Sequence, residues 1–284
     1  MKDVKSKTVK VEKHLTGERV SLYSFGFQLT LNDPDAQRHD VLRWLEHTNP
    51  SDIHNRSRRL YEKLTGEWML RSTAWKSFIH GGHRFLWVHG IPGAGKTILI
   101  SHLADKLRGL QNWRTGWALY YCYFGRSQDE AEPFLRWIIV QLCQQASFVP
   151  PELHQIYEQR HQPGINVALS ILATLLEKFG TAYVAIDGVD ESKPYTGLLA
   201  VLTTLMTDSR FAKLRLLISS REYLDIEEAL KPHTVAVSMS NEVVEGDIRI
   251  FVGAALRSNP KFQSWPPLLY REVEVALAKG ARGM

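Results

Sequence analysis

The stretch that most constrains the fold runs from Phe85 to Leu107 and reads FLWVHGIPGAGKTILISHLADKL. It places an apolar run, a glycine-rich turn and a helical pattern of apolar residues one after another. Four residues of the turn fill the pattern G-x-x-x-x-G-K-[ST]: Gly90, Gly95, Lys96 and Thr97. The strand-like run before the turn and the amphipathic run after it supply the context that this pattern requires. The stretch therefore predicts a phosphate-binding loop.

Each residue type in the turn has a chemical reason. Glycines let the backbone bend and bring its N–H groups close to phosphate oxygens, and the following helix adds the positive end of its dipole. Lys96 can reach the β- and γ-phosphates, and the Thr97 hydroxyl can ligate Mg²⁺. The spacing G-x-x-G-x-G excludes a dinucleotide fingerprint. We expect nine consecutive residues to bind the nucleotide: Gly90, Ile91, Pro92, Gly93, Ala94, Gly95, Lys96, Thr97 and Ile98.

Carboxylates follow a second apolar run. The segment YVAIDGVDES places Asp187 at the end of the run, with Asp190 and Glu191 just beyond it. An aspartate at this point can hold Mg²⁺ across from Thr97, so we expect Thr97 and Asp187 to form the metal site. A further carboxylate nearby can polarise the attacking water, which makes both Asp190 and Glu191 candidate catalytic residues. The alternative is that these two acids only decorate an Asp-Gly turn.

A third apolar run ends on an arginine. The segment LRLLISSRE reads as a strand that is followed by Ser219, Ser220 and Arg221. In a parallel sheet the carboxyl ends of the strands converge on the ligand crevice. We therefore expect Arg221 to contact the γ-phosphate as a third catalytic residue. The alternative is a surface arginine that pairs with Glu222.

Strand-like and helical segments alternate through the middle of the chain, and this alternation predicts an α/β fold with a mainly parallel sheet between helices. The expected strands are 84–90, 117–124, 181–187, 214–219 and a weaker 234–239, and the expected helices are 97–110, 132–146, 167–179 and 196–208. The strand expected at 117–124 separates the phosphate loop from the acidic strand, as is typical of the ATPase (ASCE-type) branch of P-loop NTPases rather than of simple kinases. The expected fold is thus a three-layer P-loop NTPase sheet with a helical lead-in and a C-terminal helical domain.

The same pattern divides the chain into four parts. Residues 1–34 form an extension, in which VSLYSFGFQLTL is either a short strand or an ordered tail. Residues 35–80 form a helical lead-in, where Val41, Leu42 and Leu45 share one helix face. Residues 81–240 form the nucleotide-binding domain. Residues 241–284 form a helical domain that we expect the chain to include only in part.

Composition narrows the partners and the compartment. The chain has 35 basic and 30 acidic residues, and this mild basic excess is typical of an ordinary solvated surface. We therefore do not expect nucleic acid as a partner. No window approaches 18 consecutive apolar residues and the charged N-terminus lacks the apolar core of a signal peptide, so we expect no membrane. The two cysteines, Cys122 and Cys143, lie in apolar segments and read as buried thiols. A cytoplasmic protein is expected.

Together the segments LWVHGIPGAGKTILISHL, YVAIDGVDES and LRLLISSRE resemble the NACHT branch of the STAND P-loop ATPases, most closely the versions in large fungal signalling proteins. The segment LTGEWML upstream and EGDIRIFV and WPPLLYREVEVALAKGARGM downstream extend the resemblance. It implies ATP or GTP binding with Mg²⁺, and ADP or GDP in the resting state. It also implies self-association on activation, an effector domain on one side and ankyrin or WD40 repeats on the other, which would make this chain an excised domain. The resemblance assigns the phosphate loop to Gly90–Thr97, the magnesium aspartate to Asp187, the hydrolysis acids to Asp190 and Glu191 and the sensor to Arg221.

The expected function is a Mg²⁺-dependent nucleotide switch with slow NTP hydrolysis, because a switch needs a population shift between two states rather than rapid turnover. Two alternatives belong to other classes. A nucleic-acid-stimulated, AAA-like ATPase is allowed by the basic balance, but no DNA-reading element is recognisable. A nucleotide-holding scaffold without turnover is disfavoured by the intact Lys96, Thr97 and Asp187. A small-molecule kinase fits least, given the additional strand and the helical tail.

Overall fold

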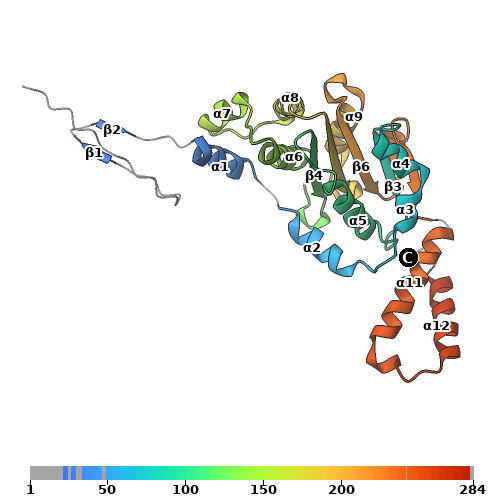
Figure 1. Ribbon diagram of the computed structural model, residues 1–284. Helices are drawn as coiled ribbons and strands as arrows, with labels where there is room; N and C mark the ends of the chain where they lie inside the picture. The colour runs from blue at the N-terminus through green and yellow to red at the C-terminus, as the bar shows by residue number, and fades with distance from the viewer. Residues whose placement is uncertain (1–21, 25–26, 30–33, 47–48, 241, 282–284) are drawn as a thin grey trace, which may run out of the picture.

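The computed structural model describes residues 22–24, 27–29, 34–46, 49–240 and 242–281. At its centre lies a five-stranded parallel sheet with the order β4-β5-β6-β3-β7 (Figure 1). Its strands are β3 (Phe85–His89), β4 (Thr115–Tyr121), β5 (Thr181–Asp187), β6 (Leu214–Ser220) and β7 (Val235–Ser238). All four pairs of neighbouring strands are parallel. The predicted fold class is therefore confirmed.

Helices cover both faces of the sheet, and the side chains of each strand alternate between the two resulting cores. Phe85 and Trp87 of β3 face one core, whereas Leu86 and Val88 face the other. The first core lies under α1 (Pro34–Leu45), α6 (Ala131–Ala146), α7 (Pro151–Glu158), α8 (Ile165–Leu176), α9 (Thr196–Thr207) and α10 (Leu224–Leu230). The second lies under α2 (Ser51–Leu60), α3 (Glu67–Arg71), α4 (Thr73–His80) and α5 (Lys96–Arg108). Burial on both faces explains why these strands read as nearly continuous apolar runs.

The helical lead-in has the expected apolar face. Val41, Leu42 and Leu45 of α1 are buried against the first core. Two helices, α7 and α10, were not predicted, because helices this short carry little periodic signal. Residues 1–21 of the predicted extension lie outside the described residues, and β1 (Leu22–Ser24) pairs antiparallel with β2 (Phe27–Leu29).

The order of the strands in space differs from their order along the chain. β4, which lies between the phosphate loop and the acidic strand in the sequence, forms one edge of the sheet. It ends at Tyr121, earlier than expected, and a short 3₁₀ turn follows at Phe124–Arg126. β6, which comes later in the sequence, lies between β3 and β5. The ends of β3 and β5 are therefore separated by β6, which carries Ser219 and Ser220 and is followed directly by Arg221.

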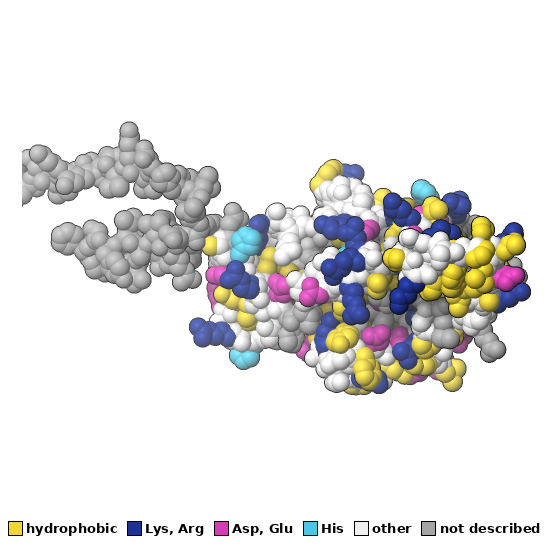
Figure 2. Space-filling view, turned by 90° about the horizontal axis from the view of Figure 1, so that it is seen from below, with side chains coloured by type: hydrophobic (Ala, Val, Ile, Leu, Met, Phe, Trp, Pro, Cys, Tyr) yellow, Lys and Arg dark blue, Asp and Glu magenta, His cyan; other side chains and the backbone are white. Residues whose placement is uncertain are grey.

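The chain leaves the sheet after β7 and forms a pair of helices, α11 (Glu242–Ser258) and α12 (Pro267–Gly280). Figure 1 shows this pair projecting from the sheet, with α11 and α12 lying side by side. We call it the helical arm. Several of its large apolar side chains are exposed, including Phe251, Leu268 and Leu277. Figure 2 views the molecule from the side of the arm and shows hydrophobic side chains gathered over this end. No helix of the described residues is long and apolar enough to cross a membrane.

Candidate functional site

The predicted phosphate loop connects β3 to α5, and its backbone has the conformation that the glycines allow. Gly93 has φ 81° and Gly95 has φ 82°, both in the left-handed region that side chains disfavour. Gly95 caps the start of α5. A Cβ on Gly90 would lie 2.8 Å from the Cβ of Met239, so this glycine also permits close packing. The first turn of a helix leaves its N–H groups without intrahelical partners, and here those groups belong to the loop.

Lys96 lies folded against the loop. Its Nζ donates to the carbonyl oxygens of Gly90 at 2.8 Å and Ile91 at 2.9 Å. Burial lowers the pKa of Lys96, while the carboxylates of Asp190 and Asp187 act in the opposite direction. A partly desolvated ammonium that faces backbone oxygens and nearby carboxylates is suited to the binding of phosphate oxygens.

Asp187 is buried at the end of β5 and is tied to both neighbouring elements. It accepts a hydrogen bond from the hydroxyl of Ser219 on β6, and the hydroxyl of Thr97 on α5 lies near enough to favour its ionised form. The Ser219 hydroxyl also accepts from the backbone N–H of Gly188 at 3.0 Å, which holds the turn after β5. Burial raises the pKa of Asp187 to about 6, against the effect of the two hydroxyl donors. The structure thus brings Thr97 and Asp187 together.

These two residues fit Mg²⁺ by the chemistry of their donor atoms, since a hydroxyl and a carboxylate are both oxygen ligands. Within the described part of the chain, no group of three or more His, Cys, Asp or Glu side chains gathers to hold a metal ion. A Mg²⁺ ion at Thr97 and Asp187 would therefore depend on phosphate oxygens and water for its other ligands. That is the usual arrangement for Mg²⁺ in sites that bind nucleotides.

Asp190 and Arg221 are joined by a hydrogen bond and an ion pair at the carboxyl end of the sheet, near Asp187. One carboxylate oxygen of Asp190 accepts from the backbone N–H of Arg221 at 2.8 Å. The other lies 3.1 Å from the Nε of Arg221. The alternative that Arg221 pairs with Glu222 is wrong, because Glu222 lies 3.1 Å from the Nδ1 of His89. The Arg221 side chain is 40% exposed and its Nη1 donates to the Tyr223 hydroxyl at 3.1 Å, so its guanidinium borders the open side of the site.

Glu191 is less constrained than Asp190. One of its oxygens accepts from the backbone N–H of Phe124 at 3.3 Å. Among the described residues, no ion pair links Glu191 to a basic side chain. Burial is the largest cause that raises the pKa of the Glu191 carboxyl, and the neighbouring Asp190 adds to the effect. Of the two predicted acids, Glu191 has the freer carboxylate.

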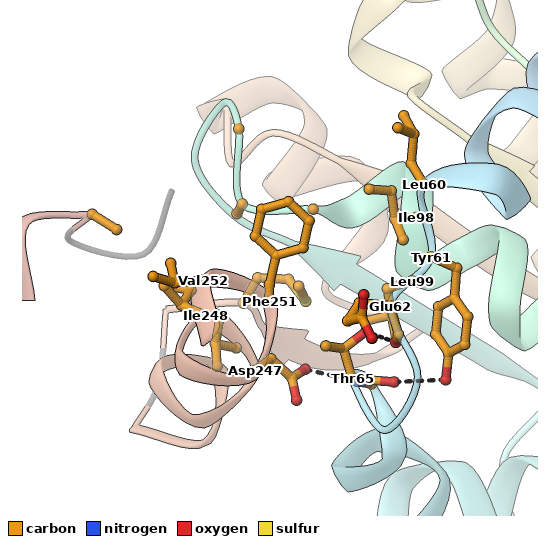
Figure 3. Close-up of a pocket in the computed structure, with 17 residues that line it drawn as sticks. Leu60, Tyr61, Glu62, Thr65, Ile98, Leu99, Asp247, Ile248, Phe251 and Val252 are labelled. Atoms are coloured by element: carbon orange, nitrogen blue, oxygen red, sulfur yellow. Dashed lines mark hydrogen bonds between the residues drawn. The ribbon is translucent and has the colours of Figure 1, made fainter. Parts of the chain in front are cut away.

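A cavity of about 320 Å³ adjoins the phosphate loop, and sequence reasoning did not find it. It lies between the turn after α2, the start of α5 and the inner face of α11 (Figure 3). Its walls are largely apolar and include Leu60, Ile98, Leu99, Met239, Val244, Ile248, Phe251 and Val252. Glu62 and Asp247 are the carboxylates of this lining, and Tyr61 and Thr65 are its hydroxyls. Leu60 and Val252 of this lining lie 192 positions apart in the sequence. The segments LTGEWML and EGDIRIFV, which extended the family resemblance, contain several of its residues, but neither one predicted a cavity.

Comparison with known proteins places the chain in a family. The family model described as "Nephrocystin 3, N-terminal" matches residues 64–221, more than half of the chain. The chain belongs to this family. The match begins within the turn that lines the cavity and includes the predicted phosphate loop and the three predicted catalytic residues, Asp190, Glu191 and Arg221.

A curated relative is the vegetative incompatibility protein HET-E-1 of Podospora anserina, which is 26% identical over 206 residues. The aligned region is 67% of this chain and 15% of HET-E-1, so the chain spans a small part of that relative. The predicted resemblance to NACHT-type domains of fungal proteins is confirmed. A solved structure, Cdc6p from Pyrobaculum aerophilum, matches with a TM-score of 0.44 and 12% identity, covering 83% of this chain and 68% of Cdc6p. At that TM-score the match carries no argument about function.

Proposed function

We propose that this Nephrocystin 3, N-terminal domain is a NACHT-type switch that binds ATP or GTP with Mg²⁺ and hydrolyses it slowly. One observation carries the proposal: Lys96, Thr97 and Asp187 converge at the carboxyl end of the sheet, with Asp187 buried and the Thr97 hydroxyl beside it. A buried carboxylate without a cation is costly. A site that retains one beside a phosphate loop is suited to a metal ion bound together with a nucleotide.

The residues of the loop have distinct roles in this proposal. The backbone N–H groups of Gly90–Ile98 bind phosphate oxygens, and the Lys96 ammonium neutralises charge on the β- and γ-phosphates. Thr97 and Asp187 would hold Mg²⁺, which supplies further positive charge to the phosphates when it is bound. The apolar cavity beside the loop accommodates the base and ribose, because binding sites for small molecules are mostly apolar with a few polar groups.

We assign the polarisation of water to Glu191 rather than to Asp190. Both oxygens of Asp190 are engaged by Arg221, whereas Glu191 keeps a carboxylate oxygen available. Its raised pKa is also the direction that makes a carboxylate a better proton acceptor. Asp190 then acts as a positioning residue that orients Arg221 towards the γ-phosphate. Arg221 serves as the sensor of that phosphate.

The wider setting is also part of the proposal. The chain corresponds to a small part of HET-E-1, which supports a module that works with other domains of a longer protein. The resemblance to NACHT-type domains implies that such a module self-associates when active. Both cysteines are buried free thiols, which supports a reducing compartment such as the cytoplasm. Slow turnover is proposed because the signal of a switch is the difference between its two nucleotide states, which rapid hydrolysis would shorten.

The decisive experiment measures nucleotide affinity in the Lys96→Ala variant by calorimetry with non-hydrolysable ATP and GTP analogues. Loss of the ammonium leaves the phosphate charge uncompensated, so we expect affinity to fall about a hundredfold. Lys106→Ala, an exposed lysine of the same helix, is the matched control and should bind as the wild type does. Unchanged affinity in Lys96→Ala would contradict the proposal.

A further inference from the structure

Asp247, on the inner face of α11, joins the helical arm to the turn before α3. One of its carboxylate oxygens accepts two hydrogen bonds, from the backbone N–H of Gly66 at 2.7 Å and from the indole Nε1 of Trp68 at 2.9 Å. Asp247 and Gly66 both line the cavity beside the phosphate loop (Figure 3). These bonds connect residues that are 181 and 179 positions apart in the sequence.

The turn that Asp247 holds has an uncommon backbone conformation. Leu64 has φ 74° and Gly66 has φ 73°, so two residues of one short segment lie in the left-handed region. A non-glycine residue is strained there and keeps such a conformation only where its surroundings enforce it. The hydrogen bond from the Gly66 N–H to Asp247 supplies part of that enforcement.

The same turn is in contact with the helix that follows the phosphate loop. A Cβ on Gly66 would lie 2.9 Å from Cδ1 of Leu99, a buried residue of α5. Gly66 therefore lies between α5 on one side and Asp247 of α11 on the other. Its position sets the distance between these two walls of the cavity.

Apolar side chains also attach the first turns of α11. Val244 is buried and Ile248 is partly buried, and both pack against the second core. Phe251, one turn further along α11, is 51% exposed although it lines the cavity. Apolar packing is weakly directional, so it leaves the exact placement of the α11 wall to directional contacts such as those of Asp247.

We infer that Asp247 is a positioning residue of the nucleotide site: through Gly66 and Trp68 it fixes the α11 wall at the spacing that the base and ribose require. This inference rests on the proposed function, because it assumes that the cavity holds the nucleoside part of the nucleotide. Asp247 itself need not contact the nucleotide. It acts through the turn that it holds.

The environment of the Asp247 carboxylate agrees with this role. Burial raises its pKa, and the N–H donors of Gly66 and Trp68 favour its ionised form. Glu67, the nearby carboxylate, disfavours that form. The two donors therefore compensate for the partial burial of the charge.

The experiment separates the nucleoside part of binding from the phosphate part. Affinities of the 284-residue chain are measured for non-hydrolysable ATP and GTP analogues and for tripolyphosphate, each with Mg²⁺. In Asp247→Ala we expect nucleotide affinity to fall about tenfold, because the Gly66 N–H and the Trp68 indole lose their acceptor. Tripolyphosphate affinity should change less than about twofold, since the phosphate loop is untouched.

Matched variants distinguish positioning from general loss of structure. Asp247→Asn retains an acceptor oxygen and should recover most of the nucleotide affinity. Trp68→Phe removes one donor but keeps the ring, and should weaken nucleotide binding by about threefold without affecting tripolyphosphate. Glu245→Ala, at an exposed position of the same helix, should match the wild type for both ligands. Trp68→Phe also serves if Asp247→Ala does not fold.

Three results would overturn the inference. Wild-type nucleotide affinity in both Asp247→Ala and Trp68→Phe shows that the contact does not position the site, although the proposed function stands. Equal loss for nucleotide and tripolyphosphate shows a general structural role. Absence of nucleotide binding in the wild type removes the proposed function, and the inference falls with it.

Discussion

The carboxyl end of the sheet, which carries the phosphate loop, Asp187 and Arg221, differs in construction from the cavity beside it. We call this end of the sheet the phosphate edge. At the phosphate edge, Asp187 and Ser219 are buried at the ends of adjacent strands, and the sheet register sets their separation. The cavity walls come from a strained turn, the first turns of α5 and a projecting helical arm. Exposed apolar residues of that arm, such as Phe251, border the opening.

The contrast indicates how the two regions divide the work of a switch. A site held by sheet hydrogen bonds and a tightly packed core keeps one geometry, since such cores resist small displacements. A site whose wall is held by a few directional contacts can respond to its occupant. We therefore expect the phosphate edge to supply chemistry and the cavity to change with the nucleotide state.

The largest expected effect is a loss of NTP hydrolysis, which tests whether the catalytic residues lie at the phosphate edge rather than in the cavity. In Glu191→Gln the side chain keeps its size but can no longer accept a proton, so we expect turnover to fall about a hundredfold or more with nucleotide affinity preserved. Release of phosphate and binding of an analogue are measured on the same preparation. Glu228→Gln, an exposed acid of α10, is the control. Full turnover in Glu191→Gln would return the assignment to Asp190.

A smaller effect tests the strained wall of the cavity. Gly66→Ala adds a Cβ at φ 73° and close to Leu99, so we expect the free energy of unfolding to fall by about 2 kcal/mol. Gly246→Ala is the matched control, because no atom lies within 4 Å of its added Cβ and it sits within α11. That control should gain up to about 1 kcal/mol from helix propensity. Denaturant unfolding measures the free energy of unfolding of both variants. Equal stability of Gly66→Ala and Gly246→Ala would show that the turn at Gly66 is not strained.

The smallest effect tests whether Asp187 is kept for function at a cost in stability. Its pKa of about 6 in the folded chain is above the value of about 4 for an unfolded aspartate. Protonation therefore stabilises the fold fully below about pH 4, and this contribution is lost as the pH rises through about 6. In Asp187→Asn we expect apo-protein stability at pH 8 to exceed that of the wild type by roughly 2 kcal/mol.

The pH dependence makes this prediction specific. The difference between Asp187→Asn and the wild type should shrink to near zero at pH 4, where the wild-type carboxyl is protonated. Mg²⁺ should stabilise the nucleotide complex of the wild type and not that of the variant. Thermal unfolding at several pH values checks all three statements. A variant that is less stable than the wild type at pH 8 would show that Asp187 is a structural residue.

Most of the phosphate edge could be predicted from the sequence because its residues are local. The pattern around Lys96 defines its own loop and helix, and Asp187 and Arg221 each follow directly from an apolar run. Parallel strands place such run-ends on one edge, so three separate motifs could be joined without a structure. The pairing of Arg221 with Asp190 rather than Glu222 could not be predicted, since it depends on the turn after β5.

The order of the strands in the sheet could not be predicted from the sequence either. Alternating patterns predicted five strands and the helices between them, but no local signal states which strands are neighbours. The tertiary structure places β6 between β3 and β5, and so brings Ser219 to Asp187. Short helices such as α7 and α10 were missed, because their few residues are positioned by packing rather than by their own periodicity.

By itself, the sequence determined the parallel α/β class, because the alternation of strand and helix patterns is visible along the chain. It also placed the glycine-rich turn before Lys96 and the acidic end of the strand at Asp187, because each of these depends on neighbouring residues. Tertiary structure alone decided the cavity, the contact of Asp247 with Gly66 and Trp68, and the different environments of Asp190 and Glu191. The physical reason is the range of the interactions. Hydrophobic periodicity and backbone preferences act along the chain, whereas a cavity wall forms only when distant segments pack together.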